Sequence, residues 1–247
     1  MISMSQTFTL KLATDNLSHD AKEIGVTTEQ LLQIKVEVTA YISQQAENEC
    51  LDNEGLKDNA TNACLKLNYE IKLPKKALAE SLQWSLWQQN NVAFDDYLWE
   101  QTCLECFISM GANRYIEINA NPDGRYALYQ FENYRQPATL PPVALLQPGS
   151  NLRAEIHWLD AHSTQRAIPT DTTHTNMIKT DNYNYRRSLC LPLAQLPYPL
   201  AINDKTLIHP CVILYFDQVA LYFAPAHAAP ADFHQRQHWS VFSHSKH

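Results

Sequence analysis

The chain has 247 residues, of which 45% are hydrophobic and 18% charged, and its formal net charge is -7. This is the composition of a globular protein, and an acidic chain without a basic stripe is a poor candidate for a general nucleic-acid binder. No stretch approaches the roughly 18 consecutive apolar residues of a membrane span.

The first third of the chain is dominated by alternating apolar and polar residues, the pattern of half-buried strands. The strands that this pattern predicts are 7–13, 33–43 and 64–73. Residues 18–30 fit either a short helix or a polar loop, and the acidic, amide-rich segment 44–62 is expected to be an exposed loop. Residues 78–89 fit a helix about as well as a strand.

The central segment 98–137 predicts three short antiparallel strands joined by two turns. A proline-rich crossover over 137–149 and a strand over 152–159 follow, and the polar residues 161–187 predict a long irregular excursion from the sheet. The last predicted strands are 207–212, 219–223 and 239–243. Many short strands with little helix predict an all-β fold, an antiparallel jelly-roll-like sandwich in a single domain over 1–247.

Two features of the sequence favour a cytoplasmic location. The N-terminus lacks a cationic start followed by a long apolar run, so we expect no secretory signal. The six cysteines show no framework spacing, which favours reduced thiols over a disulfide scaffold.

The second turn of the central segment is the better defined of the two. In the motif NPDG at 121–124, proline fits the second position of a type I turn and glycine supplies the left-handed residue that follows. A three-residue hairpin loop then places Glu117 opposite Tyr129 and Asn119 opposite Ala127.

The first turn decides how two glutamates lie relative to each other. A five-residue loop over 109–113 pairs Ile108 with Arg114, and therefore Glu105 directly with Glu117. Like charges directly opposite each other destabilise a sheet, so a cation, ligand hydroxyls or a nearby arginine should relieve them, or one carboxyl should have a raised pKa. A one-residue slip in either turn would separate the pair, and both side chains could instead be solvated and harmless.

Alternation divides the side chains of these strands between two faces. The face expected in the core carries Leu104, Cys106, Ile108, Ile116, Ile118 and Leu128. The face expected to project toward solvent carries Glu105, Glu117, Asn119 and Tyr129, with Phe107, Tyr115 and Phe131 beyond them.

Three segments, LWEQTCLECF, YIEINANPDGRYALYQFENYR and AHAAPADFH, make the chain resemble a known family. It resembles the DOMON-like domains related to family nine carbohydrate-binding modules, in particular a bacterial group of unassigned function. The resemblance implies a jelly-roll-like sandwich and non-covalent recognition of a sugar. The positions that it carries over as ligand-binding candidates are Trp99, Glu105, Glu117, Asn119, Arg125, Tyr129, Arg135, His227, Asp232 and His234.

These patterns favour a non-catalytic domain that binds a saccharide or a similar polyhydroxylated ligand. One alternative is a protein-interaction module without a small ligand. Another is a glycoside-processing enzyme that uses Glu105 and Glu117, because a retaining mechanism needs two carboxyl groups about 5–5.5 Å apart. The His and Asp side chains near the C-terminus could ligate a metal, but no zinc-protease pattern is present, so the metal stays open and calcium is the first cation to test.

Overall fold

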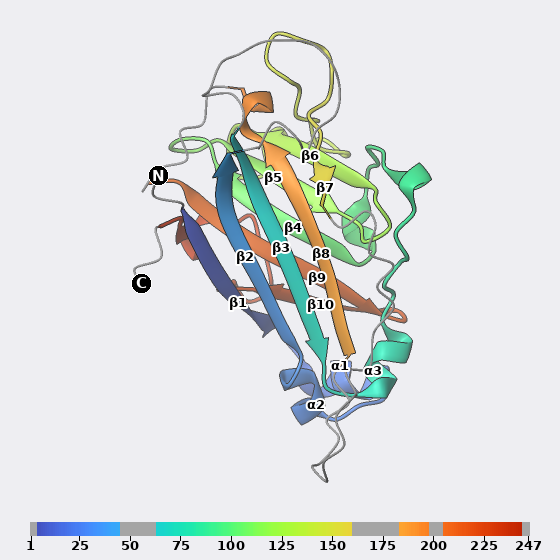
Figure 1. Ribbon diagram of the computed structural model, residues 1–247. Coiled ribbons are helices and arrows are strands. Elements are labelled where there is room, and N and C mark those ends of the chain that lie inside the picture. Colours follow the sequence, from blue (N-terminus) through green and yellow to red (C-terminus); the bar gives the residue numbers. More distant parts are fainter. Residues whose placement is uncertain (1–3, 45–62, 160–182, 198–204, 244–247) are drawn as a thin grey trace.

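The computed structural model describes residues 4–44, 63–159, 183–197 and 205–243, which are drawn in colour in Figure 1. The predicted all-β fold is confirmed. The strands are β1 (Ser5–Ala13), β2 (Lys35–Gln44), β3 (Ala63–Leu73), β4 (Cys103–Ser109), β5 (Tyr115–Ala120), β6 (Tyr126–Phe131), β7 (His157–Trp158), β8 (Tyr183–Pro192), β9 (Leu207–Phe216), β10 (Val219–Ala224) and β11 (Ser240–Val241). They pair in the order β6-β5-β4-β9-β10-β1-β2-β3-β8-β7, and β11 pairs with β9.

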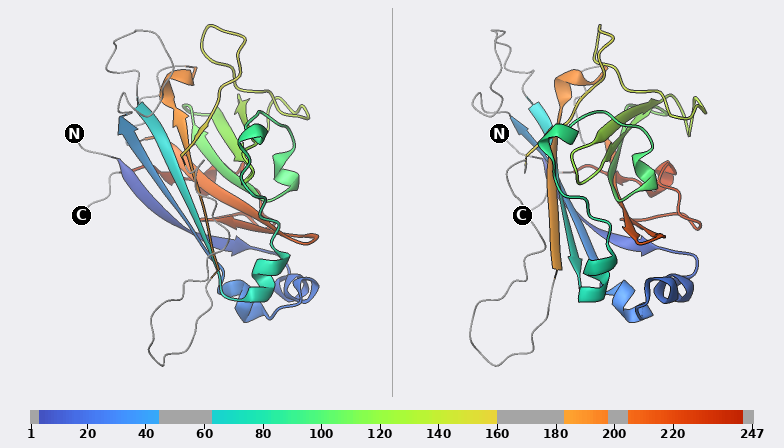
Figure 2. Two further views of the ribbon diagram at one scale, coloured as in Figure 1. Left: turned by 45° about the vertical axis from the view of Figure 1, so that its right-hand side comes forward. Right: turned by 90° about the vertical axis from the view of Figure 1, so that its right-hand side faces the viewer.

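The sheet folds over on itself at β1, so that two layers face each other (Figure 2). Residues 5–10 of β1 pair with β2, whereas residues 11–13 pair with β10. We call β2, β3, β8 and β7 layer A, and β6, β5, β4, β9, β10 and β11 layer B. One strand therefore belongs to both layers, which explains how an antiparallel sheet closes into a sandwich without a break in pairing.

Short helices connect the strands at one end of layer A (Figure 1). They are α1 (Leu17–Ile24), α2 (Thr28–Leu32) and α3 (Lys76–Ser81), and the 3-10 turns are η1 (Gln89–Asn91), η2 (Leu98–Glu100), η3 (Leu193–Gln195) and η4 (Arg236–His238). The Asn16 side chain caps the start of α1, and Thr27 and Gln30 form a reciprocal capping box at α2. Of the two interpretations of residues 18–30, the helical one is therefore correct.

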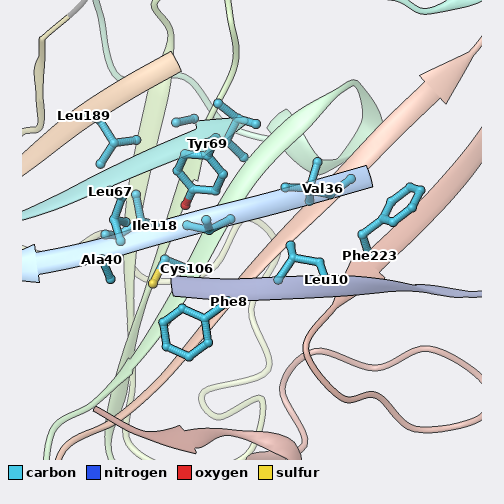
Figure 3. Close-up of a cluster of buried hydrophobic side chains, with 14 of the residues drawn as sticks. Phe8, Leu10, Val36, Ala40, Leu67, Tyr69, Cys106, Ile118, Leu189 and Phe223 are labelled. Atoms are coloured by element: carbon cyan, nitrogen blue, oxygen red, sulfur yellow. The ribbon is translucent and has the colours of Figure 1, made fainter. Parts of the chain in front are cut away.

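The main core lies between the layers (Figure 3). All six residues predicted for the core face of the central strands belong to it. Tyr69 of β3 reaches across from layer A, and its hydroxyl donates a hydrogen bond of 2.9 Å to the backbone oxygen of Glu105 on β4. The phenol oxygen is thereby satisfied although the ring is 1% exposed.

Several predicted elements need correction. The strand expected over 152–159 is reduced to the two residues of β7. The expected excursion over 161–187 ends earlier, because β8 begins at Tyr183 and pairs along its length with β3. The sequence did not predict the start of β8 because its first residues are polar. Layer A exposes its outer face, so a strand in this layer need not be apolar. The loop 44–62, apart from Gln44 at the end of β2, and residues 161–182 lie outside the described residues.

Within the described ranges, no helix combines the length and the apolar character that crossing a bilayer requires. The five cysteines in those ranges are buried free thiols, whereas Cys50 lies outside them.

Candidate functional site

The central strands β4, β5 and β6 are buried on both faces. Their inner face belongs to the core, and their outer face carries a second apolar cluster. Residues from η2 and from the segment 225–239 pack onto this outer face. In consequence, the face expected to project toward solvent is covered by loops, and that expectation is wrong.

The register of β5 against β6 is the predicted one, with Glu117 opposite Tyr129 and Asn119 opposite Ala127. The register of β4 against β5 differs by two residues. The amide of Met110 donates a 2.8 Å hydrogen bond to the carbonyl of Arg114, so the loop shortens to residues 111–113.

This shift changes how the two glutamates lie. Glu105 is opposite Asn119, and Glu117 is opposite Phe107, so the expected direct pairing of the two glutamates is wrong. A shift of two residues preserves the alternation of side chains, and the carboxyls stay on one face as diagonal neighbours.

The two carboxyl groups form the floor of a cavity of about 390 Å³ on the outer face of layer B. The candidate residues that the structure brings together there are Trp99, Glu105, Glu117, Arg135, Asp232 and His234. Further walls come from Phe107, Phe131, Tyr222 and Phe233, and from the segment 137–142, the first part of the proline-rich crossover. The cavity therefore combines a polar floor with largely apolar walls, the usual composition of a small-molecule site.

Glu117 is held by a chain of hydrogen-bonding groups. The amide nitrogen of Asn119 donates to its Oε1 at 2.8 Å, and Nε2 of His234 lies 3.8 Å from its Oε2. The hydroxyl of Tyr115 lies 2.8 Å from Nδ1 of His234 and accepts the backbone N–H of Arg135 at 3.0 Å. The hydroxyl of Tyr115 can donate its proton to Nδ1 or accept one from it, according to the tautomer of His234.

Burial sets the protonation of these groups. Desolvation raises the pKa of Glu117 to about 7, although the hydrogen bond from Asn119 and the charge of Arg135 oppose it. Desolvation, and next the charge of Glu117, hold the pKa of Glu105 well above its ordinary value. Desolvation and then Arg135 lower the pKa of His234 to about 3. His234 is therefore neutral at pH 7, and its contact with Glu117 is not an ion pair.

An ion pair joins the two loops at the rim of the cavity. The guanidinium of Arg135 lies 2.9 Å from Oδ1 of Asp232, whose Oδ2 accepts the hydroxyl of Tyr134 at 2.5 Å. The backbone N–H of His234 donates to Oδ1 of Asp232 at 3.1 Å. Asp232 thus fixes both the arginine and the turn that carries His234.

Two candidates lie behind the cavity wall. Asn119 is 0% exposed and acts on Glu117. Tyr129 is also 0% exposed, meets the ring of Trp99 edge-on at 6.0 Å, and donates its hydroxyl proton to Asp96 at 2.8 Å. Its ring is not free to stack on a ligand.

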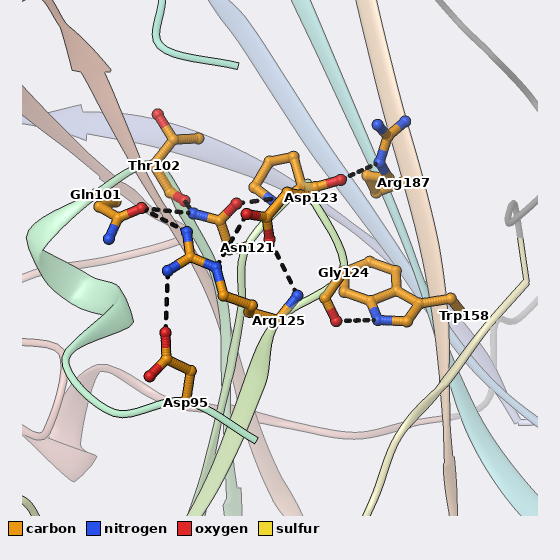
Figure 4. A network of polar contacts seen from close by, with 10 residues as sticks. Asp95, Gln101, Thr102, Asn121, Asp123, Gly124, Arg125, Trp158 and Arg187 are labelled. Carbon is orange, nitrogen blue, oxygen red and sulfur yellow. Dashed lines mark hydrogen bonds and ion pairs between the residues drawn. The ribbon is translucent and has the colours of Figure 1, made fainter. Parts of the chain in front are cut away.

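Arg125 lies at the far end of the β5–β6 hairpin, in a polar network around the NPDG turn (Figure 4). Its guanidinium binds Asp123, Asp95 and Gln101 at 2.8 to 2.9 Å. Two backbone oxygens of the same turn accept hydrogen bonds of 2.9 Å. The N–H at Nε of Arg187 donates to the oxygen of Pro122, and the indole N–H of Trp158 donates to the oxygen of Gly124. Arg125 therefore ties the turn to the loops that carry Asp95 and Gln101, whereas Arg187 of β8 and Trp158 of β7 join the turn to layer A.

The remaining candidate, His227, lies within hydrogen-bond distance of its neighbour's backbone, with 3.0 Å between Nδ1 and the oxygen of Ala228. It does not belong to the cavity lining among the described residues. Those residues also contain no group of three or more His, Cys, Asp and Glu side chains placed to hold a metal ion.

Sequence reasoning missed part of the cavity. Phe107 and Phe131 were placed on the correct face by alternation. Tyr222 and Phe233 could not be placed there, because β10 and the C-terminal segment reach the site through contacts distant in sequence.

Comparison with known proteins leaves the family open. No family model matches the chain, and no curated protein matches it. A solved structure of a proposed carbohydrate-binding protein from Bacteroides uniformis is similar at 12% identity and a TM-score of 0.43, covering 96% of this chain and 85% of the other. A TM-score at this level supports no conclusion about function.

Proposed function

We propose that this protein is a non-catalytic binding domain for a saccharide or a similar polyhydroxylated ligand, which occupies the cavity on the outer face of layer B. The observation that carries the proposal is the cavity itself, with Glu105 and Glu117 on its floor and aromatic rings on its walls. Its volume of about 390 Å³ is in the range of small-ligand sites. The motif resemblance to DOMON-like domains agrees with this proposal and is independent of the cavity.

The groups in the cavity suit a molecule with both hydroxyl and C–H surfaces. The carboxyl groups of Glu105 and Glu117 and the guanidinium of Arg135 can exchange hydrogen bonds with hydroxyls. The rings of Trp99 and Phe131 can cover the C–H face of a sugar ring. Each hydroxyl transferred from water gains little net free energy, so we expect modest affinity.

Glycoside processing is the second candidate, because two carboxyl groups share the cavity floor. A retaining mechanism needs one of them ionised as the nucleophile while the other is protonated. Desolvation raises the pKa of Glu117 to about 7 and that of Glu105 well above its ordinary value, which withholds an ionised nucleophile below neutral pH. At and above neutral pH, an ionised Glu117 beside a protonated Glu105 matches that requirement, so protonation does not distinguish binding from hydrolysis. An assay of glycoside cleavage distinguishes them.

The test is a glycan array followed by calorimetry on the full chain, with and without calcium. Glu117→Gln is the test variant, and Glu70→Gln is the matched control, since Glu70 lies on the outer face of layer A in contact with Arg186. We expect the wild type to bind at least one saccharide. Glu117→Gln should weaken the affinity about tenfold, which corresponds to the loss of one net hydrogen bond, and Glu70→Gln should leave the affinity unchanged.

Two other results would contradict the proposal. Silence across the array would favour a protein-interaction module. Cleavage of a glycoside that is abolished in Glu117→Gln would instead identify an enzyme.

A further inference from the structure

The cavity lining is rich in acidic side chains and poor in basic ones. It carries the acids Glu105, Glu117 and Asp232 but a single arginine, Arg135. The guanidinium of Arg135 is already paired with Asp232 at 2.9 Å. His234 offers no positive charge at neutral pH, because burial lowers its pKa to about 3.

The strands that flank Glu105 supply no cation either. Cys211 of β9 is opposite Glu105, and Cys103 precedes it on the same face of β4. Burial raises the pKa of both thiols well above the ordinary value, so both are neutral. Tyr222 of β10 and Tyr215 of β9 have pKa values raised by burial and are neutral as well.

Glu105 is also short of hydrogen-bond donors. Its side chain lines the cavity although the residue is 3% exposed. Within the part of the chain that the structure describes, the nearest side-chain donor to its carboxyl is the thiol of Cys103, which donates to Oδ1 of Asn119 at 3.7 Å. A thiol is a weak donor with one proton, so the carboxyl of Glu105, which lines the cavity, lacks a strong donor. A buried acceptor without a donor is rare in folded proteins and points to a missing ligand group.

We propose that the ligand carries a positively charged amino group, as in a sugar with a free amine, and that this group binds against Glu105 and Glu117. This inference rests on the proposed function and narrows its ligand class. An ammonium group supplies three donors, and its positive charge favours ionisation of the carboxyl group that it contacts. The rings of Trp99, Phe107 and Phe131 on the cavity walls also suit a cation.

Binding of such a ligand is coupled to protons. At about pH 6 the free protein holds protons on Glu105 and Glu117, because burial raises the pKa of both. A bound ammonium group favours the carboxylate, so the O–H bond of one carboxylic acid breaks and its proton passes to the buffer. A neutral sugar leaves these protons in place.

The test is calorimetry on the full chain with glucosamine, galactosamine and mannosamine, each against its N-acetyl derivative and the corresponding hexose. Titrations at about pH 6, where the amines are protonated, in two buffers of different ionisation enthalpy count the protons released. We expect one amine to bind at least about tenfold more tightly than both neutral counterparts, with net proton release.

The matched variants are Glu105→Gln, expected to abolish the preference and the proton release, and Glu70→Gln, expected to retain both. Gln resembles the protonated acid in shape and charge, and circular dichroism checks that the variant folds.

Equal or tighter binding of the neutral sugars would overturn the amine inference and leave the proposed function standing. Absence of binding by all nine sugars would overturn the inference and count against the proposed function. Binding of calcium alone that is lost in Glu105→Gln would also overturn the inference, by assigning the carboxyls to a metal.

Discussion

Replacing Glu117 by Gln should stabilise the free protein at alkaline pH. Glu117 is 5% exposed, and its pKa is raised from 4.5 to about 7, mainly by desolvation. A carboxyl with a raised pKa in the folded state binds protons more tightly there than in the unfolded chain. The folded protein therefore loses stability as the pH rises from about 4.5 through about 7.

The size of the effect follows from the shift. A difference of about 2.5 pKa units corresponds to about 3 kcal/mol of unfolding free energy, complete above about pH 8. His209 and His234 act in the opposite direction, because burial lowers the pKa of both to about 3 and their cost appears as the pH falls below 6.5. Subtracting the wild-type curve from that of the variant removes these contributions.

The assay is urea denaturation of the wild type and Glu117→Gln between about pH 5 and pH 9. The free-energy difference between them should move in favour of the variant by up to about 3 kcal/mol across this range. Glu70→Gln is the control. Desolvation by burial acts to raise the pKa of Glu70, but hydrogen bonds from Arg186 and Lys72 outweigh it and lower the pKa. The free-energy difference between Glu70→Gln and the wild type should therefore not move in favour of the variant as the pH rises. Parallel curves for wild type and Glu117→Gln would refute the reasoning.

Two further predictions concern stability. Gly124 has φ +119°, and an added Cβ would lie 3.2 Å from the Trp87 ring and 3.3 Å from Val92. Gly111 has φ +113°, but a Cβ added there would meet nothing within 4 Å. Urea denaturation should therefore show that Gly124→Ala lowers the unfolding free energy by about 1 kcal/mol or more beyond Gly111→Ala. His209 is 0% exposed, and neither of its ring nitrogens has a hydrogen-bond partner among the described residues. His209→Leu should therefore raise the unfolding free energy by about 1 kcal/mol at neutral pH, and by more toward pH 5. A lower unfolding free energy at both pH values would contradict this prediction.

The phase of the central strands was predictable because it depends on short-range features. Side chains alternate strictly along a strand, and the turn at 121–124 is specified by proline and glycine. Both β5–β6 pairs and the core face were therefore predicted correctly. The loop at 111–113 has one glycine and no proline, so its length was ambiguous and the register of β4 was misjudged by two residues.

The covering of the outer face could not be predicted in the same way. Alternation shows that Glu105 and Glu117 share a face, but not whether that face is open to solvent. The loops that bury it come from residues far away in sequence, such as Asp232 and His234, and from the crossover 137–142. Their positions depend on the order of strands in layer B, which periodicity does not specify.

A crystal structure of the protein with its tightest-binding saccharide tests the central claim most directly. The account predicts ligand oxygen or nitrogen atoms within hydrogen-bond distance of Glu105 or Glu117, and a ring face against Trp99 or Phe131. A saccharide seated instead on the polar outer face of layer A, around Thr39, would contradict it.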